Sequence, residues 1–270
     1  MCTLIIGRDV LGSGTLLVGA NRDEDPTRPS EPPAPLSSGS HVVGGRDVRS
    51  GGTWLAIRDG HRMIALLNRR GVASASSAAL RSRGLLALDV AGAGGNPGDS
   101  FARDALAVAL ASIDQHAYAP FSLVCMTREG GWVLPHDGTR ISKLRAIGPG
   151  WHVLTHGDLD DGAEPRTLRL KRKLEGFKPR TTGEAETRVL EMLSLHGTLG
   201  DGAPPETPEP EPADADAVDH TAVCIHTGRM VTVSTSLFRL STAGARYIHV
   251  EGRPCTTPPR DLSTLLQPTP

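Results

Sequence analysis

The chain has 270 residues, 38% of them hydrophobic, which is enough material for a globular core, and a formal net charge of -1. The near-neutral charge and the small number of aromatic residues (four Phe, three Trp and two Tyr) give no basis for binding nucleic acid. The sequence has no apolar run long enough to span a bilayer and no secretory signal at its start. We therefore expect no stable membrane insertion and a cytoplasmic, thiol-reduced location.

The four cysteines are widely separated and never form a C-x-x-C pair. This spacing argues against a zinc knuckle, a thioredoxin-like redox pair and a c-type haem attachment. Cys125 and Cys224 lie inside apolar runs, so we expect them to be buried core residues. The sequence therefore predicts no metal site.

Two hairpins are predicted in the first seventy residues, from short apolar runs separated by glycine-containing turns. The polar, proline-rich segment from Asp25 to about Gly52 connects the hairpins and is expected to be a loop. The four predicted strands are Thr3–Ile6, Thr15–Val18, Thr53–Ile57 and Met63–Leu67.

Helical spacing begins at Phe101, after a candidate N-cap at Asp99 or Ser100. Two further helices are predicted: one opens with the basic stretch 166–173, and the other spans 187–196 and is ended by Gly197. Residues 200–219 hold five prolines and seven acidic residues without Lys or Arg, which predicts a flexible acidic loop. The order of strands, helices and strands indicates one α+β domain spanning 1–270 with a mostly antiparallel sheet. The later strands are predicted at 121–126, 132–134, 151–155, 221–225, 230–238 and 246–250.

The start of the chain carries the most distinctive chemistry. Methionine aminopeptidase removes Met1 when the second residue is small, which would leave Cys2 with a thiol and a free α-amine. Such an amine titrates near ~7.7–8.0, so it can take the thiol proton and activate Cys2 as a nucleophile. The alternative is that Cys2 is a frayed terminal residue without a role.

A polar cluster, Asn21-Arg22-Asp23-Glu24-Asp25, follows the second predicted strand. If the first two strands pair, this cluster lies close to Cys2. Arg22 would then stabilise a thiolate or hold a substrate carboxylate, and Asp23 would anchor the α-ammonium. The alternative is a solvated turn whose charges pair with one another.

These motifs, together with Arg28-Pro29-Ser30, Gly51-Gly52-Thr53-Trp54-Leu55-Ala56 and Ala65-Leu66-Leu67-Asn68, resemble the NRDE family, which includes the transport and Golgi organization protein 2 homologues. The clear resemblance covers residues 1–70. It implies an N-terminal-nucleophile hydrolase-like fold, a four-layer αββα sandwich with mostly antiparallel sheets.

The resemblance also implies roles for single residues. Choloylglycine hydrolases are similar at the same places, and by that analogy Asn68 donates its amide N–H to the oxyanion of a tetrahedral intermediate, although it also suits a turn. No cofactor is required by this reading. The implied catalytic residues are Cys2, Arg22, Asp23 and Asn68, and the implied ligand contacts are Asn21, Glu24, Trp54 and His156.

Two functions remain open at this stage, with a purely structural role as a third possibility. The first is a cysteine hydrolase that cleaves an amide or thioester acyl bond through an acyl-enzyme. The second is non-catalytic handling of a small ligand, such as transported haem, acyl-CoA or lipid, on the same scaffold. The sequence departs from the family at Thr155-His156, where a Ser-Asn pair is usual, and near Arg229, which stands apart from the expected arginine position.

Two weaker candidates remain in the middle of the chain. His152 and His156 share one face of a predicted strand, but without a third ligand nearby a structural role is favoured over metal or haem binding. The basic segment 166–173 is expected to be a solvated helix face, with a phosphate or carboxylate site as the alternative.

Overall fold

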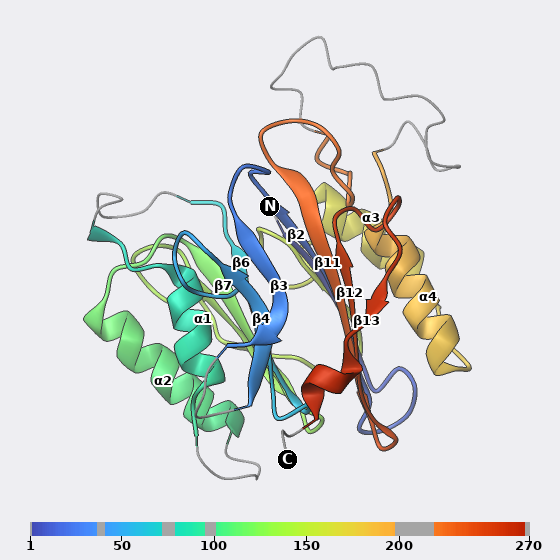
Figure 1. The fold of residues 1–270 in the computed structure, drawn as a ribbon, viewed down its shortest axis with the longest axis horizontal. Coiled ribbons are helices and arrows are strands. Elements are labelled where there is room, and N and C mark those ends of the chain that lie inside the picture. Colours follow the sequence, from blue (N-terminus) through green and yellow to red (C-terminus); the bar gives the residue numbers. More distant parts are fainter. Residues whose placement is uncertain (1, 37–40, 72–78, 95–100, 198–218, 268–270) are drawn as a thin grey trace.

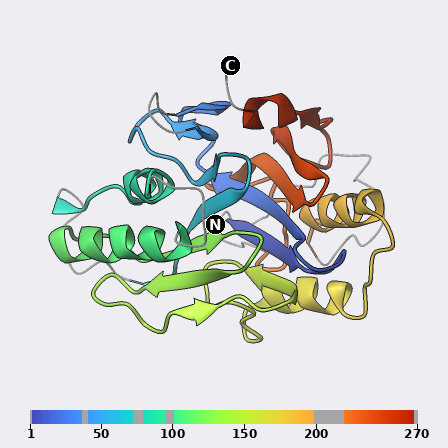
Figure 2. The same cartoon turned by 90° about the horizontal axis from the view of Figure 1, so that it is seen from below.

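The computed structural model describes residues 2–36, 41–71, 79–94, 101–197 and 219–267, and it forms four layers. Two antiparallel sheets lie face to face, α1 (Arg83–Ala91) and α2 (Phe101–Gln115) cover one of them, and α3 (Pro165–Leu174) and α4 (Thr182–Leu193) cover the other (Figure 1, Figure 2). Within the described residues, no helix has both the length and the apolar character needed to cross a membrane.

The first sheet has six strands and carries the N-terminus. Its order is β10 (Gly150–Leu154), β1 (Thr3–Arg8), β2 (Leu16–Glu24), β11 (Val231–Ser241), β12 (Gly244–Glu251) and β13 (Arg260–Asp261). The second sheet has seven strands in the order β3 (Ser30–Pro35), β4 (Val42–Asp47), β5 (Leu55–Arg58), β6 (Arg62–Asn68), β7 (Phe121–Met126), β8 (Gly131–His136) and β9 (Arg145–Ala146).

Strand β1 shows how the sequence builds these layers. Side chains alternate between the two faces of a strand, and both faces of β1 are apolar. Leu4 and Ile6 belong to the cluster that fills the space between the two sheets. Ile5 points the other way, into the cluster beneath α3 and α4. A third cluster lies between the second sheet and α1 and α2.

Both predicted hairpins are confirmed, and so is the helix that begins at Phe101. The proposed cap of that helix and nearly all of the predicted acidic loop lie outside the described residues. Helix α4 begins five residues before the predicted start because Thr181 caps it, its hydroxyl accepting from the backbone N–H of Glu184 at 3.1 Å. It ends at Leu193, before the predicted stop at Gly197.

Two predictions about the elements were wrong, and one helix was missed. The segment 25–52 is not only a loop but contains β3 and β4, and β3 tolerates its prolines because it is an edge strand with an irregular register. Helix α1 was missed, and its N-cap Ser82 makes no side-chain capping bond. Residues 221–225 form no strand: the N–H groups of Val223 and Cys224 both donate to the Leu195 carbonyl instead.

Candidate active site

A cavity of about 500 Å³ lies at the start of β1 and is lined by residues from both sheets and from the start of α1. The lining includes five of the predicted site residues, which are far apart in the sequence but meet here: Cys2, Arg22, Glu24, Trp54 and Asn68. Antiparallel pairing explains part of this convergence. Thr3 pairs with Asn21, which places Cys2 opposite Arg22 on the neighbouring strand.

Cys2 is half-buried at the floor of this cavity and packs against the cluster between the sheets. Burial raises the pKa of its thiol, and the negative charge of Asp23 acts in the same direction. A backbone hydrogen bond at Asp23 and the Arg22 guanidinium oppose this rise in the pKa. The thiol therefore depends on a nearby base to become a thiolate near neutral pH.

Arg22 is almost fully buried, and its guanidinium lies 4.3 Å from the centre of the Trp54 ring. Its Nη1 donates to Ser30 Oγ at 3.1 Å, and its Nη2 lies 3.6 Å from Asp47 and 3.9 Å from Glu24. Burial lowers the pKa of Arg22, but the guanidinium remains charged at physiological pH. Stacking and two loose ion pairs hold this charge at the wall of the cavity.

Asp23 lies beneath the site and not on the cavity wall. Its Oδ2 is 3.3 Å from Arg166 Nη1, its Oδ1 accepts from the Thr232 hydroxyl at 2.7 Å, and both charged side chains are fully buried. Burial raises the pKa of Asp23, and the charge of Arg166 opposes the rise. Arg166 also donates to the Thr3 hydroxyl at 3.1 Å, so this pair holds the residue that follows Cys2 to the neighbouring strand β2.

The G-G-T-W motif shapes the opposite wall. A Cβ at Gly52 would lie 2.2 Å from the backbone carbon of Gly84, so only glycine permits the observed contact with the start of α1. The N–H of Thr53 donates to the Gly84 carbonyl at 3.0 Å. This contact places Trp54 and the neighbouring Arg83 at the same cavity.

Three arginines at the cavity were not predicted as site residues: Arg28, Arg81 and Arg83. Arg28 pairs with Asp47 at 2.6 Å, and Arg81 pairs with Asp89 at 2.7 Å. Arg83 donates to the Pro120 carbonyl at 2.7 Å, and no carboxylate of a described residue lies within ion-pair distance of it. With Arg22 the lining holds four arginines against two carboxylates, Glu24 and Asp47, a formal excess of two positive charges.

Two residues predicted as ligand contacts lie elsewhere. The Asn21 amide donates to the carbonyls of Leu193 and Val223 at 2.8 and 2.9 Å, and its oxygen accepts from the Thr235 hydroxyl at 2.6 Å. Asn21 therefore ties the sheet to α4 and has no donor left for a ligand. His156 is buried and does not line the cavity.

His156 faces Glu164, with 3.7 Å between Nε2 and Oε1. Burial lowers the pKa of His156 to about 4, so the ring is neutral at physiological pH. His152 bonds Asp160 at 2.7 Å and the Gly148 carbonyl at 3.0 Å, which is the structural role favoured by the sequence. Arg229 is exposed and lies outside the cavity lining.

The basic segment 166–173 is not the solvated face that was expected. Arg166 is fully buried against Asp23, and Arg169 donates to the carbonyls of His196 and Thr221. Lys171 donates to the Trp151 carbonyl at 2.8 Å. Most of these cations therefore hold α3 in place, and none lines the cavity.

Comparison with known proteins identifies the fold. Two variants of the conjugated bile acid hydrolase from Clostridium perfringens, one with its Cys at position 2 changed to Ala, superpose with a TM-score of 0.53 at 10% sequence identity, over 98% of this chain and 93% of theirs. The Caenorhabditis elegans ortholog of N-acylethanolamine-hydrolyzing acid amidase is 17% identical, with a TM-score of 0.49 over 87% of this chain and 92% of that one. No curated protein matches the sequence.

The likeness to the bile acid hydrolase confirms the predicted fold class, an α+β N-terminal-nucleophile hydrolase-like fold with two antiparallel sheets and, in the described residues, four α-helices. At 10% identity it carries the fold and not the activity. A family model described as Transport and Golgi organisation 2 matches residues 1–226, most of the chain.

Proposed function

Because this chain belongs to the Transport and Golgi organisation 2 family and has the fold of N-terminal-nucleophile hydrolases, we propose that it is a cysteine hydrolase that cleaves the amide or thioester bond of a small, anionic acyl substrate. The observation that carries the proposal is the convergence of Cys2, Arg22 and Asn68 on one cavity. The conjugated bile acid hydrolase, which shares this fold, is named as a hydrolase, in agreement with this reaction class.

In the proposed reaction Met1 is removed and the α-amine of Cys2 takes the proton of the thiol. The sulfur attacks the acyl carbonyl carbon, and the developing oxyanion accepts a hydrogen bond from the Asn68 amide. Collapse of this intermediate breaks the C–N or C–S bond, and the leaving group takes the proton from the amine. Water then attacks the acyl-enzyme and releases the acid. Asp23 holds the chain around Cys2 but lies too deep to contact the substrate.

The charge of the cavity supports an anionic substrate. Four arginines line it, and Arg83 has no carboxylate partner among the described residues. A guanidinium binds a carboxylate or phosphate through two parallel N–H donors, which fixes the orientation of the bound group. We place the anionic end of the substrate near Arg83 and Arg22 and the scissile carbonyl near Cys2.

The test compares the wild-type protein with Cys2→Ala on a panel of acylated amino acids and acyl thioesters. Each substrate is paired with a matched form in which the carboxylate is replaced by a neutral group. The proposal expects release of the free acid by the wild-type protein, preferentially from the carboxylated members, and none by Cys2→Ala. Equal release by both proteins would place the reaction at another residue. An intact mass that retains Met1 would remove the amine from the mechanism.

One observation favours a second candidate, the non-catalytic handling of an anionic ligand. Burial raises the pKa of the Cys2 thiol, which disfavours the thiolate, whereas the arginines bind anions regardless of that thiol. Haem propionates and the phosphates of acyl-CoA both suit such a cavity. Binding of either ligand with equal affinity to wild type and Cys2→Ala, and lost in Arg83→Met, would support this second function.

A further inference from the structure

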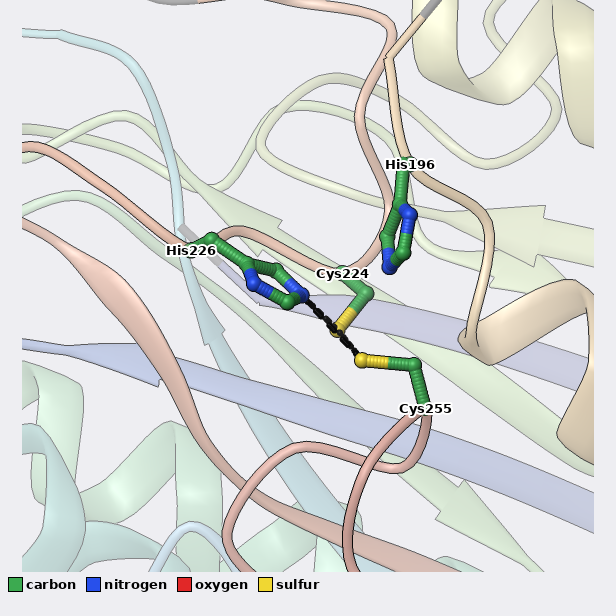
Figure 3. A group of neighbouring side chains, drawn as sticks. All are labelled: His196, Cys224, His226 and Cys255. Atoms are coloured by element: carbon green, nitrogen blue, oxygen red, sulfur yellow. Dashed lines mark hydrogen bonds between the residues drawn. The ribbon is translucent and has the colours of Figure 1, made fainter. Parts of the chain in front are cut away.

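A group of four side chains outside the cavity, His196, Cys224, His226 and Cys255, brings two imidazoles and two thiols to one point (Figure 3). Their nearest ligand atoms all lie within 4.8 Å of one another. His196 follows α4, Cys224 and His226 precede β11, and Cys255 lies between β12 and β13, so three separate segments meet here. We propose that these four residues bind a zinc ion that joins the three segments.

The ligand-atom distances are close to the edges of a metal tetrahedron, with one pair slightly shorter than the ideal edge. The two sulfurs are 3.5 Å apart, and His226 Nε2 lies 3.7 Å from Cys224 Sγ and 3.1 Å from Cys255 Sγ. A tetrahedral zinc ion with bonds of about 2.3 Å to sulfur and about 2.0 Å to nitrogen separates its ligand atoms by roughly 3.3–3.8 Å. In Figure 3 the ring of His196 lies beside the two sulfurs, in the place of a fourth ligand.

The ligand set selects zinc by its chemistry. Two thiolates and two neutral imidazoles suit a borderline-soft ion with tetrahedral geometry, and the two thiolates balance its double charge. Four protein ligands leave no position open for water or substrate. The site is therefore of the closed, structural kind, and it does not compete with Cys2 as a reaction centre.

The backbone around the ligands is held by further hydrogen bonds. The N–H of Cys224 donates to the carbonyl of Leu195 at 2.8 Å, which joins the residues next to His196 to the second ligand segment. Arg169 donates to the His196 carbonyl, and Arg253 donates to the His226 carbonyl at 3.0 Å. Such outer contacts orient the ligands of structural metal sites.

The proposed site is connected to the candidate active site. Between Cys224 and His226, the N–H of Ile225 donates to the Thr232 hydroxyl at 2.9 Å, and that hydroxyl donates to Asp23 at 2.7 Å. Zinc would thus position Asp23 and, through Arg166, the Thr3 hydroxyl next to Cys2, without touching the substrate. The metal proposal does not depend on catalysis, because it concerns residues outside the cavity.

No motif in the sequence indicates this site. The partners of the C-x-H pair at 224–226 lie 28 residues before Cys224 and 31 residues after it, outside any zinc-finger spacing. Cys224 is buried as expected. Its sulfur is also one of the proposed zinc ligands, which the apolar residues around it in the sequence do not reveal. The proposal therefore departs from the expectation of no metal site.

The test measures the metal content of the full-length protein purified without chelators and then incubated with zinc chloride and desalted. We expect about one zinc per chain by plasma mass spectrometry. We expect at least ten-fold less zinc per chain in the double variant Cys224→Ser/Cys255→Ser and in the single variant His226→Ala. The exposed His220→Ala, in the same segment, should retain it. Equal metal content in all four proteins, or none in the wild type, would overturn the proposal.

A second measurement needs no variant and therefore remains decisive if the ligand variants fail to fold. Cobalt(II) added to the metal-free wild type should give the intense visible absorption of a tetrahedral thiolate site, and zinc should displace it. X-ray absorption of the zinc form should show two sulfur and two nitrogen neighbours. A weak octahedral spectrum, or a Cys224–Cys255 disulfide in freshly purified protein, would contradict the proposal.

Discussion

The buried pair of Asp23 and Arg166 provides a quantitative test of the structure beneath the site. Replacing Arg166 with methionine keeps much of its volume but leaves the Asp23 carboxylate without its closest cation, 3.3 Å away. Both side chains are fully buried, so water cannot replace the lost contact. Removing one partner of a buried ion pair costs about 3–5 kcal/mol. We expect Arg166→Met to lose this much unfolding free energy at pH 7, as measured by urea denaturation.

The double variant Arg166→Met/Asp23→Asn separates the ion pair from simple loss of packing. Asn at position 23 still accepts a hydrogen bond from the Thr232 hydroxyl but carries no charge. The double variant should therefore lose about 2 kcal/mol less unfolding free energy than the two single variants lose together. The loss in Arg166→Met should also shrink as the pH falls through the raised pKa of Asp23, because a protonated carboxyl no longer requires a cation.

Arg172 gives the matched control, since it lies on the same helix and is exposed. Arg172→Met should change the unfolding free energy by no more than about 0.5 kcal/mol. A loss in Arg166→Met as small as in this control, or losses at Asp23 and Arg166 that are additive within about 0.5 kcal/mol, would show that the buried ion pair does not stabilise the fold.

Three further outcomes follow from the structure. Gly52→Ala should lose about 1–3 kcal/mol in urea denaturation because its Cβ would collide with the backbone of α1, whereas Gly183→Ala meets open space and should not destabilise. Arg83→Met should weaken binding of a carboxylated acyl ligand by about 1.5–3 kcal/mol in calorimetry, and the exposed Arg103→Met should not. Burial lowers the pKa of His249 from 6.5 to about 4. Between these two pH values His249 is protonated in the unfolded chain but neutral in the folded one. The free energy of unfolding should therefore fall by about 1.4 kcal/mol for each pH unit that the pH drops through this range. His249→Gln should show a correspondingly flatter pH dependence, and an unchanged slope would contradict the assignment.

Local sequence pattern predicted the elements whose apolar periodicity is regular. The two early hairpins and the helix at Phe101 are examples, because alternation and helical spacing follow directly from which face is buried. The sequence pattern did not predict the secondary structure correctly where tertiary contacts determine it. Strand β3 contains prolines yet pairs at a sheet edge, and residues 222–225 are buried without joining a ladder.

The candidate site was predictable to the extent that strand pairing determines it. A register that pairs Thr3 with Asn21 brings Cys2 beside Arg22, and this follows from the order of the first two strands. The contribution of Arg83 was not predictable, because it depends on the backbone contact of α1 with Gly52. Asn21 belongs to the same motif as Arg22, but alternation along β2 points it to the opposite face, into hydrogen bonds with α4.

The most direct test of the proposed function is the mass of the protein before and after exposure to an activated acyl thioester that carries a carboxylate. We expect a chain lacking Met1 that gains one acyl group on Cys2, located on the first proteolytic peptide, and loses it again on incubation with water. Cys2→Ala should gain none. A chain that retains Met1, or an acyl group distributed equally over Cys2 and Cys255, would contradict the assignment of Cys2 as the N-terminal nucleophile.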